Sequence, residues 1–160
     1  MSGAGTGGSV ARVRAALAAA RHPDTIIAFP EGTRTAAEAA VAVGCTIAQI
    51  AKSIVFRAGD RPVVIITSGA NRVDQARAGA ALGVALGRAD PDWVRHSTGF
   101  AVGGVAPVGY AVPPLMLLDE DLLPLDPVWA AAGSPRHVFQ TTTRALLRMT
   151  GAKLAAIRSV

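Results

Sequence analysis

Apolar residues recur at the three-to-four-residue spacing of an amphipathic helix in several parts of the chain. The first of these follows Ser9, a residue type that caps helix N-termini. Thr35 with Glu38 forms a capping-box pattern, and Thr46 with Gln49 repeats it. The predicted helices cover residues 10–21, 35–43, 46–51 and 72–82, a turn that starts at 90, and a last helix that Thr143 caps and Gly151 ends.

Short runs of β-branched and other apolar residues predict the strands. Lys52–Arg57 and Pro62–Thr67 are two such runs, and Ala58–Arg61 between them predicts a hairpin. Phe100–Gly109 reads as a glycine-rich loop. The remaining predicted strands cover residues 25–29, 115–118, 138–141 and 154–157.

Strands and helices mix without the regular alternation of a doubly wound parallel sheet, which predicts an α+β fold. Residues 1–8 are small and polar and predict a disordered tail, and residues 9–160 predict one domain without repeats or linkers. The chain has 160 residues, of which 51% are hydrophobic, so it can bury a core. No apolar run approaches the roughly 18 residues of a membrane span, and the N-terminus lacks the order of a signal peptide. We therefore expect a cytoplasmic protein with no membrane partner.

The formal net charge is +5 and the sequence pI about 10.6, mostly because of arginine. Such an excess favours a polyanionic partner, with RNA or DNA first, although a genome rich in alanine and arginine would give the same charge without a partner. Aromatic residues make up only 4%, which argues against a base-stacking platform. Five arginines are candidates to face RNA or solvent: Arg12, Arg14, Arg21, Arg144 and Arg148.

The common catalytic motifs are absent from the sequence: it has no nucleophile elbow, no zinc-protease motif, no Walker loop and no dinucleotide fingerprint. His22, His96 and His137 are far apart and lack carboxylates at ligand spacing, so we expect neither a metal site nor another cofactor. Cys45 is the single cysteine, which excludes an internal disulfide. It is best interpreted as a small buried hydrophobic residue.

Lys52 is one of two lysines in a chain that otherwise uses arginine. It lies where a short predicted helix leads into an apolar strand, and a compact ammonium there could hold a phosphate or orient a polar group. The alternative is a strand-edge lysine whose alkyl stem packs while its charge stays in water. Two turns are further candidates: the segment 103–109 can approach a ligand closely and aim amides at an oxyanion, and the segment 132–137 carries a cation and an imidazole.

Three stretches together resemble the YbaK/EbsC family. They are CTIAQIAKSIVF at 45–56, TGFAVGGVAPVG at 98–109 and AGSPRHVF at 132–139. This family includes bacterial Cys-tRNA(Pro) deacylases, ProXp-type trans-editing proteins and the editing insertion of bacterial prolyl-tRNA synthetases. The resemblance covers about residues 30–158 and rests on a lysine after a short helix, combined with a G-x-x-x-P loop some fifty residues later.

The resemblance implies a single α+β domain with a mixed, partly closed, barrel-like sheet flanked by helices. It also implies hydrolysis, in trans, of the ester that joins a wrong small amino acid (Ala, Cys, Ser or Thr) to tRNA, with tRNA and an aminoacyl-tRNA synthetase as partners. By the family motifs, the residues tied to activity are Lys52, Gly103 and Pro107. The residues expected at the substrate are Gly104, Val105, Ala106, Gly133, Ser134 and His137.

An aminoacyl ester is already activated, so its hydrolysis needs positioning and oxyanion stabilisation more than a strong nucleophile. We expect Lys52 to fix the terminal adenosine or its phosphate, and the amides of Gly103–Val105 to hold the scissile carbonyl. The attacking group would be water, or a hydroxyl or thiol of the substrate itself. Two alternatives stay open: a non-catalytic module that binds tRNA or a synthetase, and a hydrolase of small esters or thioesters.

Overall fold

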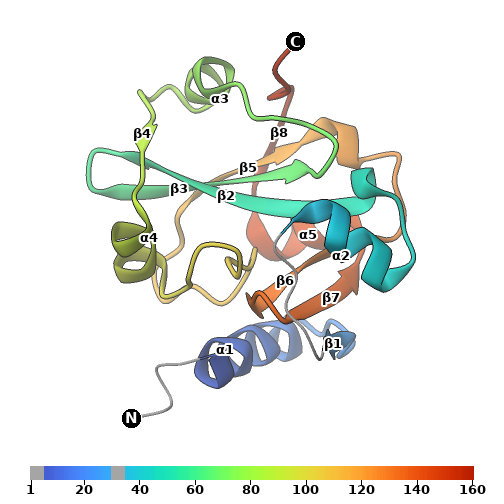
Figure 1. The fold of residues 1–160 in the computed structure, drawn as a ribbon. Coiled ribbons are helices and arrows are strands. Elements are labelled where there is room, and N and C mark those ends of the chain that lie inside the picture. Colours follow the sequence, from blue (N-terminus) through green and yellow to red (C-terminus); the bar gives the residue numbers. More distant parts are fainter. Residues whose placement is uncertain (1–5, 30–34) are drawn as a thin grey trace.

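The computed structural model describes residues 6–29 and 35–160, and it confirms an α+β fold (Figure 1). The α-helices in these residues are α1 (Thr6–Ala19), α2 (Ala36–Val43), α3 (Gln75–Leu82), α4 (Pro91–Thr98) and α5 (Thr143–Thr150). The strands are β1 (Ile26–Ala28), β2 (Ile50–Ala58), β3 (Arg61–Ser68), β4 (Gly87–Arg88), β5 (Leu115–Asp119), β6 (Val128–Ser134), β7 (His137–Thr141) and β8 (Lys153–Ala155). Two 3₁₀ turns, η2 (Ile47–Gln49) and η3 (Glu120–Leu122), precede β2 and follow β5.

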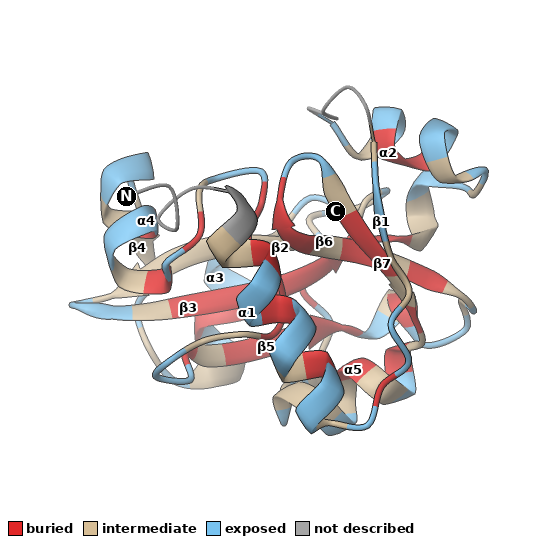
Figure 2. Cartoon of the chain, turned by 90° about the horizontal axis from the view of Figure 1, so that it is seen from below, coloured by how far each residue is buried: buried red, intermediate tan, exposed pale blue. Residues whose placement is uncertain are grey.

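The described strands form one mixed, partly open sheet in the order β1-β7-β6-β2-β3-β5-β8, and β4 adds to β2. The β2–β3 and β6–β7 pairs are antiparallel, whereas β2–β6, β3–β5 and β5–β8 are parallel. Strand β3 lies between β2 and β5, and Val63 to Ile66 are fully buried because both faces of the strand are covered. Figure 2 shows buried residues along the strands and exposed residues on the outer faces of the helices.

Local signals in the sequence account for most element boundaries. Both side-chain bonds of the capping box at Thr35 and Glu38 are present, and α2 ends at Gly44, whose φ of 75° is the left-handed conformation of a helix C-cap. The same reciprocal pattern at Thr46 and Gln49 opens η2. The predicted hairpin is confirmed, and its strands extend beyond the predicted residues at both ends.

The ends of the chain correct two predictions. Helix α1 begins at Thr6, so Ser9 lies inside it and does not cap it, and residues 6–8 do not belong to a tail. The backbone of Ser9 lies against Gly133 of β6, so tertiary packing supports α1 near its start. The predicted tail residues 1–5 lie outside the described residues. The cap of α5 is Thr142 rather than Thr143, whose hydroxyl donates to the carbonyl of Leu122 instead.

The sheet splits where the candidate lysine lies. Strand β2 pairs with β6 only at Ile50 and Ala51, and with β4 only at Phe56 and Arg57. Between these points, residues 52–55 pair with β3 on one side and with no described strand on the other. This split opens a space beside β2 that no neighbouring strand fills.

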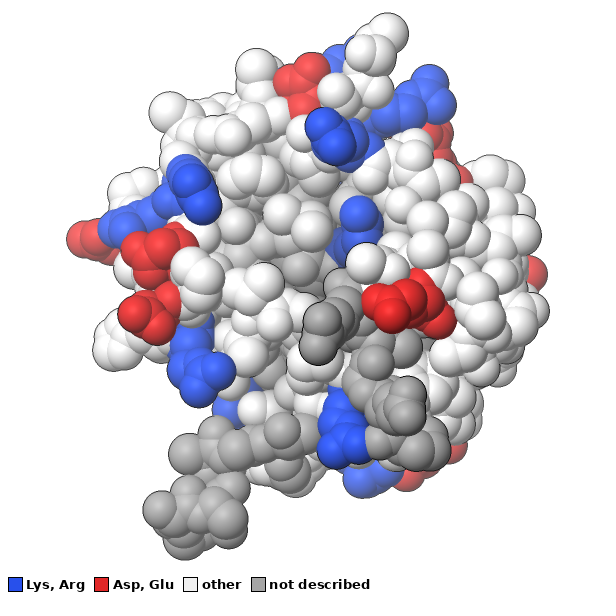
Figure 3. Space-filling view, in the orientation of Figure 1, with Lys and Arg blue, Asp and Glu red and all other residues white. Residues whose placement is uncertain are grey.

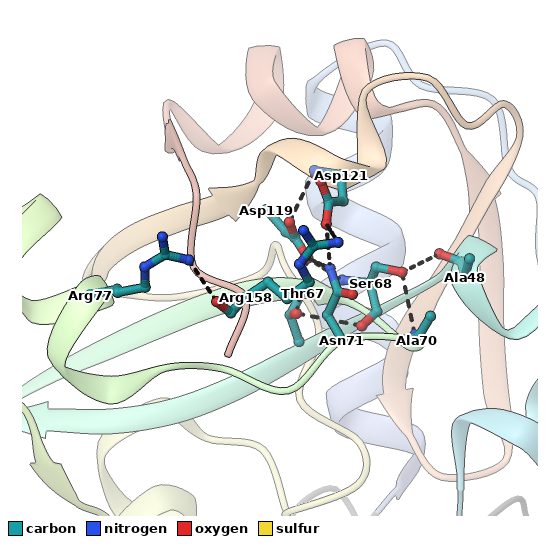
Figure 4. A network of polar contacts seen from close by, with 9 residues as sticks. All are labelled: Ala48, Thr67, Ser68, Ala70, Asn71, Arg77, Asp119, Asp121 and Arg158. Atoms are coloured by element: carbon teal, nitrogen blue, oxygen red, sulfur yellow. Dashed lines mark hydrogen bonds and ion pairs between the residues drawn. The ribbon is translucent and has the colours of Figure 1, made fainter. Parts of the chain in front are cut away.

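A hydrogen-bond network around the buried carboxylate of Asp119 holds the end of β3, which pairs with the start of β2 (Figure 4). Asp119 is fully buried at the end of β5, and its Oδ2 accepts hydrogen bonds from the Thr67 hydroxyl (3.1 Å), the Ser68 amide (3.0 Å) and the Asn71 side chain (2.8 Å). Its Oδ1 accepts from the amide of Asp121 (3.0 Å). The Asp119 carboxylate therefore joins the ends of β3 and β5 to the loop after β3.

The same hydrogen-bond network extends to β2, the strand that carries Lys52. Thr67 and Ser68 are the cross-strand partners of Lys52 and Ala51, and the Ser68 hydroxyl donates to the carbonyl of Ala48 in η2 at 2.8 Å. Satisfied hydrogen bonds in a buried site hold their partners in one arrangement. The position of Lys52 thus depends on contacts made on the side of β2 away from the split.

We predict that Asp119→Ala lowers the free energy of unfolding by about 3 kcal/mol, because the buried Ser68 amide and the buried Thr67 hydroxyl lose their acceptor. Urea unfolding monitored by circular dichroism measures this. The control is Asp60→Ala, which removes a fully exposed carboxylate from its 3.2 Å ion pair with Arg57 and should leave the unfolding midpoint unchanged. An Asp119→Ala protein as stable as the Asp60→Ala protein would contradict the role given to this network.

Candidate functional site

A cavity of about 410 Å³ lies at the split in the sheet. Its floor is formed by β2 from Ile50 to Val55 and by β6 from Trp129 to Ala131, with Val138 of β7. Helix α2 and its cap form one wall, and the loop between α4 and β5 forms another together with the β6–β7 turn. The volume and the mostly apolar lining are typical of sites for small ligands.

Strand pairing explains which side chains face this cavity. Paired residues in a sheet project to the same face, and the projection alternates along each strand. Ile50 pairs with Trp129, and Ala131 pairs with Val138, so these four side chains share one face. Lys52 follows Ile50 by two residues and therefore projects to the same face.

Lys52 makes no hydrogen bond and no ion pair with any residue that the structure describes, and it is half-buried. The described residues that line the cavity include no Asp or Glu. A charge in an apolar environment costs free energy unless an opposite charge or a polar group compensates it. The ammonium of Lys52 is therefore available to an oxygen atom of a ligand. This arrangement favours a binding role for Lys52 over that of a strand-edge lysine whose charge stays in water.

The loop between α4 and β5 supplies backbone amides at the same cavity. Gly103 (φ 90°) and Val105 line the cavity. The Gly104 amide is already used, because it donates to the carbonyl of Ala101 at 2.9 Å. The amides of Gly103 and Val105 have no hydrogen-bond partner within the described residues. The expected set of carbonyl-binding amides thus narrows to these two.

The turn between β6 and β7 brings Ser134 and His137 together. The Ser134 hydroxyl lies 2.6 Å from Nδ1 of His137 and accepts a hydrogen bond from the amide of Arg136 at 3.0 Å. Ser134 is buried, and Nδ1 is the one acceptor within reach of its proton among the described groups. We therefore assign the donor role to Ser134, which leaves the imidazole proton on Nε2.

Burial lowers the pKa of His137 below its ordinary value, and the charges of Arg14 and Arg136 lower it further. The imidazole is consequently neutral at pH 7 and presents a hydrogen-bond donor. Because both His137 and Ser134 line the cavity, this donor can act on a bound ligand.

Four of the predicted site residues do not line the cavity: Gly104, Ala106, Pro107 and Gly133. A Cβ on Gly104 would lie 2.7 Å from the Cα of Ser134, so this glycine lets the loop contact the turn. Ala106 is buried, and its carbonyl accepts the hydroxyl of Tyr110 at 2.6 Å. Gly133 has φ 101° and lies against Ser9 of α1.

Several residues that line the cavity were not predicted. Thr35, Ala36 and Ala39 face it from α2, and Trp129 and Ala131 face it from β6. The capping box identified α2 but not the side of the helix that faces β2. Strand β6 was missed altogether, because alanine-rich VWAAAGS has little strand propensity.

The described part of the chain gives no support for a metal site or a cysteine nucleophile. It contains no cluster of three or more His, Cys, Asp or Glu residues that could hold a metal ion. Cys45 donates its thiol to the carbonyl of Thr46, and burial raises the pKa of this thiol, which disfavours a thiolate nucleophile. Within these residues, no helix is long and apolar enough to cross a membrane.

On the face that Figure 3 draws, the described Lys and Arg side chains are spaced apart and form no single patch. Arg14 pairs with Asp24 at 2.9 Å, and Arg148 donates to the carbonyl of Ala20 at 2.8 Å. Arg12 donates to two carbonyls, those of Gly99 and Gly109. These three guanidinium groups thus have roles within the fold.

Residues 30–149 match the family model described as the aminoacyl-tRNA editing domain. YwhH of Bacillus subtilis, an uncharacterized protein, is 28% identical over 147 residues, which are 91% of this chain and 94% of YwhH. A crystal structure described as that of a proposed trans-editing enzyme for prolyl tRNA synthetase is 43% identical. It covers 95% of this chain and 98% of its own, with a TM-score of 0.89. A structure from a study of scaffold proteins for linear epitopes is 40% identical, with the same coverage and TM-score.

The lowered pKa predicts that His137 titrates below 6.5, and the hydrogen bond from Ser134 to Nδ1 predicts that the neutral imidazole carries its proton on Nε2. Imidazole ¹⁵N shifts measured against pH report both properties, and Arg14→Ala should raise the midpoint. As pH falls, the unfolded chain protonates His137 before the folded protein does. The contribution of His137 to folding stability is therefore present above pH 6.5 and is lost as pH falls through the lower pKa of the folded state. A midpoint above 6.5, or a proton on Nδ1, would contradict the assignment.

Proposed function

The chain belongs to the aminoacyl-tRNA editing domain family, and we propose from this premise that it hydrolyses the ester of mischarged tRNAs in trans. The resemblance to the YbaK/EbsC family and the predicted fold class are both confirmed. Action in trans is supported by the likeness to the proposed trans-editing enzyme, which extends over 98% of that chain. Residues 9–160 would then form one editing domain.

The observation that carries this proposal is the ammonium of Lys52, which lies at an apolar cavity and has no partner in the described part of the chain. Beside it lie the amides of Gly103 and Val105, which have no partner among the described residues. The ammonium can bind a phosphate or ribose oxygen, and the two amides can bind an ester carbonyl. Together they suit a ligand that carries these groups close to one another. The terminal aminoacyl-adenosine of a charged tRNA has these groups.

The residues can divide the reaction as follows. Lys52 holds the terminal adenosine or its phosphate, and the Gly103 and Val105 amides bind the carbonyl oxygen as it gains negative charge. Water attacks the carbonyl carbon, the ester bond breaks, and the ribose oxygen leaves with a proton. The neighbouring 2′-hydroxyl can transfer that proton, while the neutral His137 donates a hydrogen bond from Nε2. Positioning and oxyanion stabilisation are the main contributions to catalysis in this scheme.

The walls of the cavity favour a small amino acid. Ala36, Ala39 and Ala131 line it from opposite sides, and Val102 and Val138 add apolar surface. The ribose would occupy part of the volume, and we assign the space beside these small side chains to Ala, Cys, Ser or Thr. Discrimination among these four amounts to about 1–3 kcal/mol for each methylene in such a pocket.

Deacylation of alanyl-, cysteinyl-, seryl- and threonyl-tRNA tests the function. We expect hydrolysis of at least one of them above the spontaneous rate. We also expect Lys52→Ala and Lys52→Arg to lower the rate on the order of 10²-fold with near-normal thermal unfolding, because a planar guanidinium cannot replace a point donor.

The matched control is Lys153→Ala, the other lysine, whose ammonium donates to the carbonyl of Ala81 outside the cavity and should not affect the rate. Binding of tRNA without hydrolysis would instead favour a non-catalytic module. Hydrolysis of small esters alone would favour the other hydrolase class. A fully active Lys52→Ala protein would overturn the role proposed for this residue.

A further inference from the structure

Arg12 of α1 contacts both ends of the loop that carries Gly103 and Val105. Its Nη2 donates to the carbonyl of Gly99 at 2.9 Å, and its Nε donates to the carbonyl of Gly109 at 3.3 Å. The guanidinium also lies over the ring of Phe100, 4.7 Å from the ring centroid. One side chain thus joins two backbone positions ten residues apart and packs on an aromatic ring between them.

The loop between these carbonyls has few other backbone bonds. From Phe100 to Gly109, the backbone makes one hydrogen bond to itself within the described structure, from Gly104 to Ala101. The Tyr110 hydroxyl adds a bond to Ala106, and the Tyr110 ring contacts that of Phe100 edge to face at 5.4 Å. At the Phe100 end, the Thr98 hydroxyl also bonds to the Phe100 backbone, and Phe100 and Ala106 are buried in the core. Among the described side chains, Arg12 is the one that bonds to both ends of the loop.

We propose that Arg12 is a positioning residue, which sets where the amides of Gly103 and Val105 point. The inference rests on the proposed function, since these amides are there assigned to the scissile carbonyl. Arg12 lies before residue 30, where the match to the family model begins. A helix outside that match would thus complete the geometry of the carbonyl-binding loop.

Arginine suits this role for a geometric reason. Its planar guanidinium offers several N–H groups in a fixed arrangement and stacks on an aromatic face, so it can serve two carbonyls and Phe100 together. Lysine has the same charge on a single rotatable head group. Replacement of Arg12 by lysine therefore keeps the charge but not the two-ended contact.

The test compares Arg12→Ala and Arg12→Lys with Arg148→Ala. Arg148 also donates to a backbone carbonyl, that of Ala20 just after α1, but it does not contact the loop. On the preferred aminoacyl-tRNA, we expect both Arg12 variants to lower kcat roughly tenfold or more, with KM nearly unchanged, because the loop is displaced while tRNA binding remains. Arg148→Ala should keep the wild-type kcat.

Amide hydrogen exchange supplies a readout that does not depend on activity. Exchange in residues 100–109 should become faster in Arg12→Ala than in Arg148→Ala, at a temperature where both are folded. An unchanged exchange rate overturns the proposal, and so does an increase in KM with unchanged kcat, which would make Arg12 a tRNA contact. If the wild-type protein deacylates no tRNA, the proposed function fails, and the exchange comparison still decides whether Arg12 fixes the loop.

Discussion

A cation with no counter-ion among the described residues, held beside an apolar cavity, is the constraint around which the site is built. Lys52 projects where β2 has left β6 and not yet met β4, and no described acidic residue lines the space that it faces. Such a charge is unfavourable until a ligand compensates it. The bonds of Asp119 on the opposite side of β3 hold the strand ends that keep Lys52 there. The fold thereby stabilises an arrangement that, on the proposed function, a bound substrate would compensate.

Close backbone contacts connect three segments that are far apart in the sequence. Gly104 lets the amide-bearing loop contact Ser134, and Gly133 lets the β6–β7 hairpin contact Ser9 of α1. A side chain at either glycine would collide with backbone atoms at 2.7 Å. The glycines of the two motifs therefore act in different ways. Gly103 is placed to offer an amide to a ligand, whereas Gly104 and Gly133 hold the walls together.

The sequence predicted those parts of the fold that local chemistry determines. The capping boxes at Thr35 and Thr46 and the β2–β3 hairpin needed no tertiary information. Strand β6 could not be predicted, because its alanines become a strand only through pairing with β2 and β7. The motif residues led to Lys52 and to the two turns. The wall formed by α2 and the two-ended contact of Arg12 depend on long-range packing, which residue spacing does not reveal.

The central claim is that Lys52 and the amides of Gly103 and Val105 bind one ligand end together. Nuclear magnetic resonance with a non-hydrolysable amide analogue of 3′-alanyl-adenosine tests this most directly. The account predicts that the Lys52 Nζ resonance and both amide resonances shift with one dissociation constant. The Gly104 amide, which already donates to Ala101, should move less. Saturable binding that leaves Lys52 and both amides unperturbed would contradict the account.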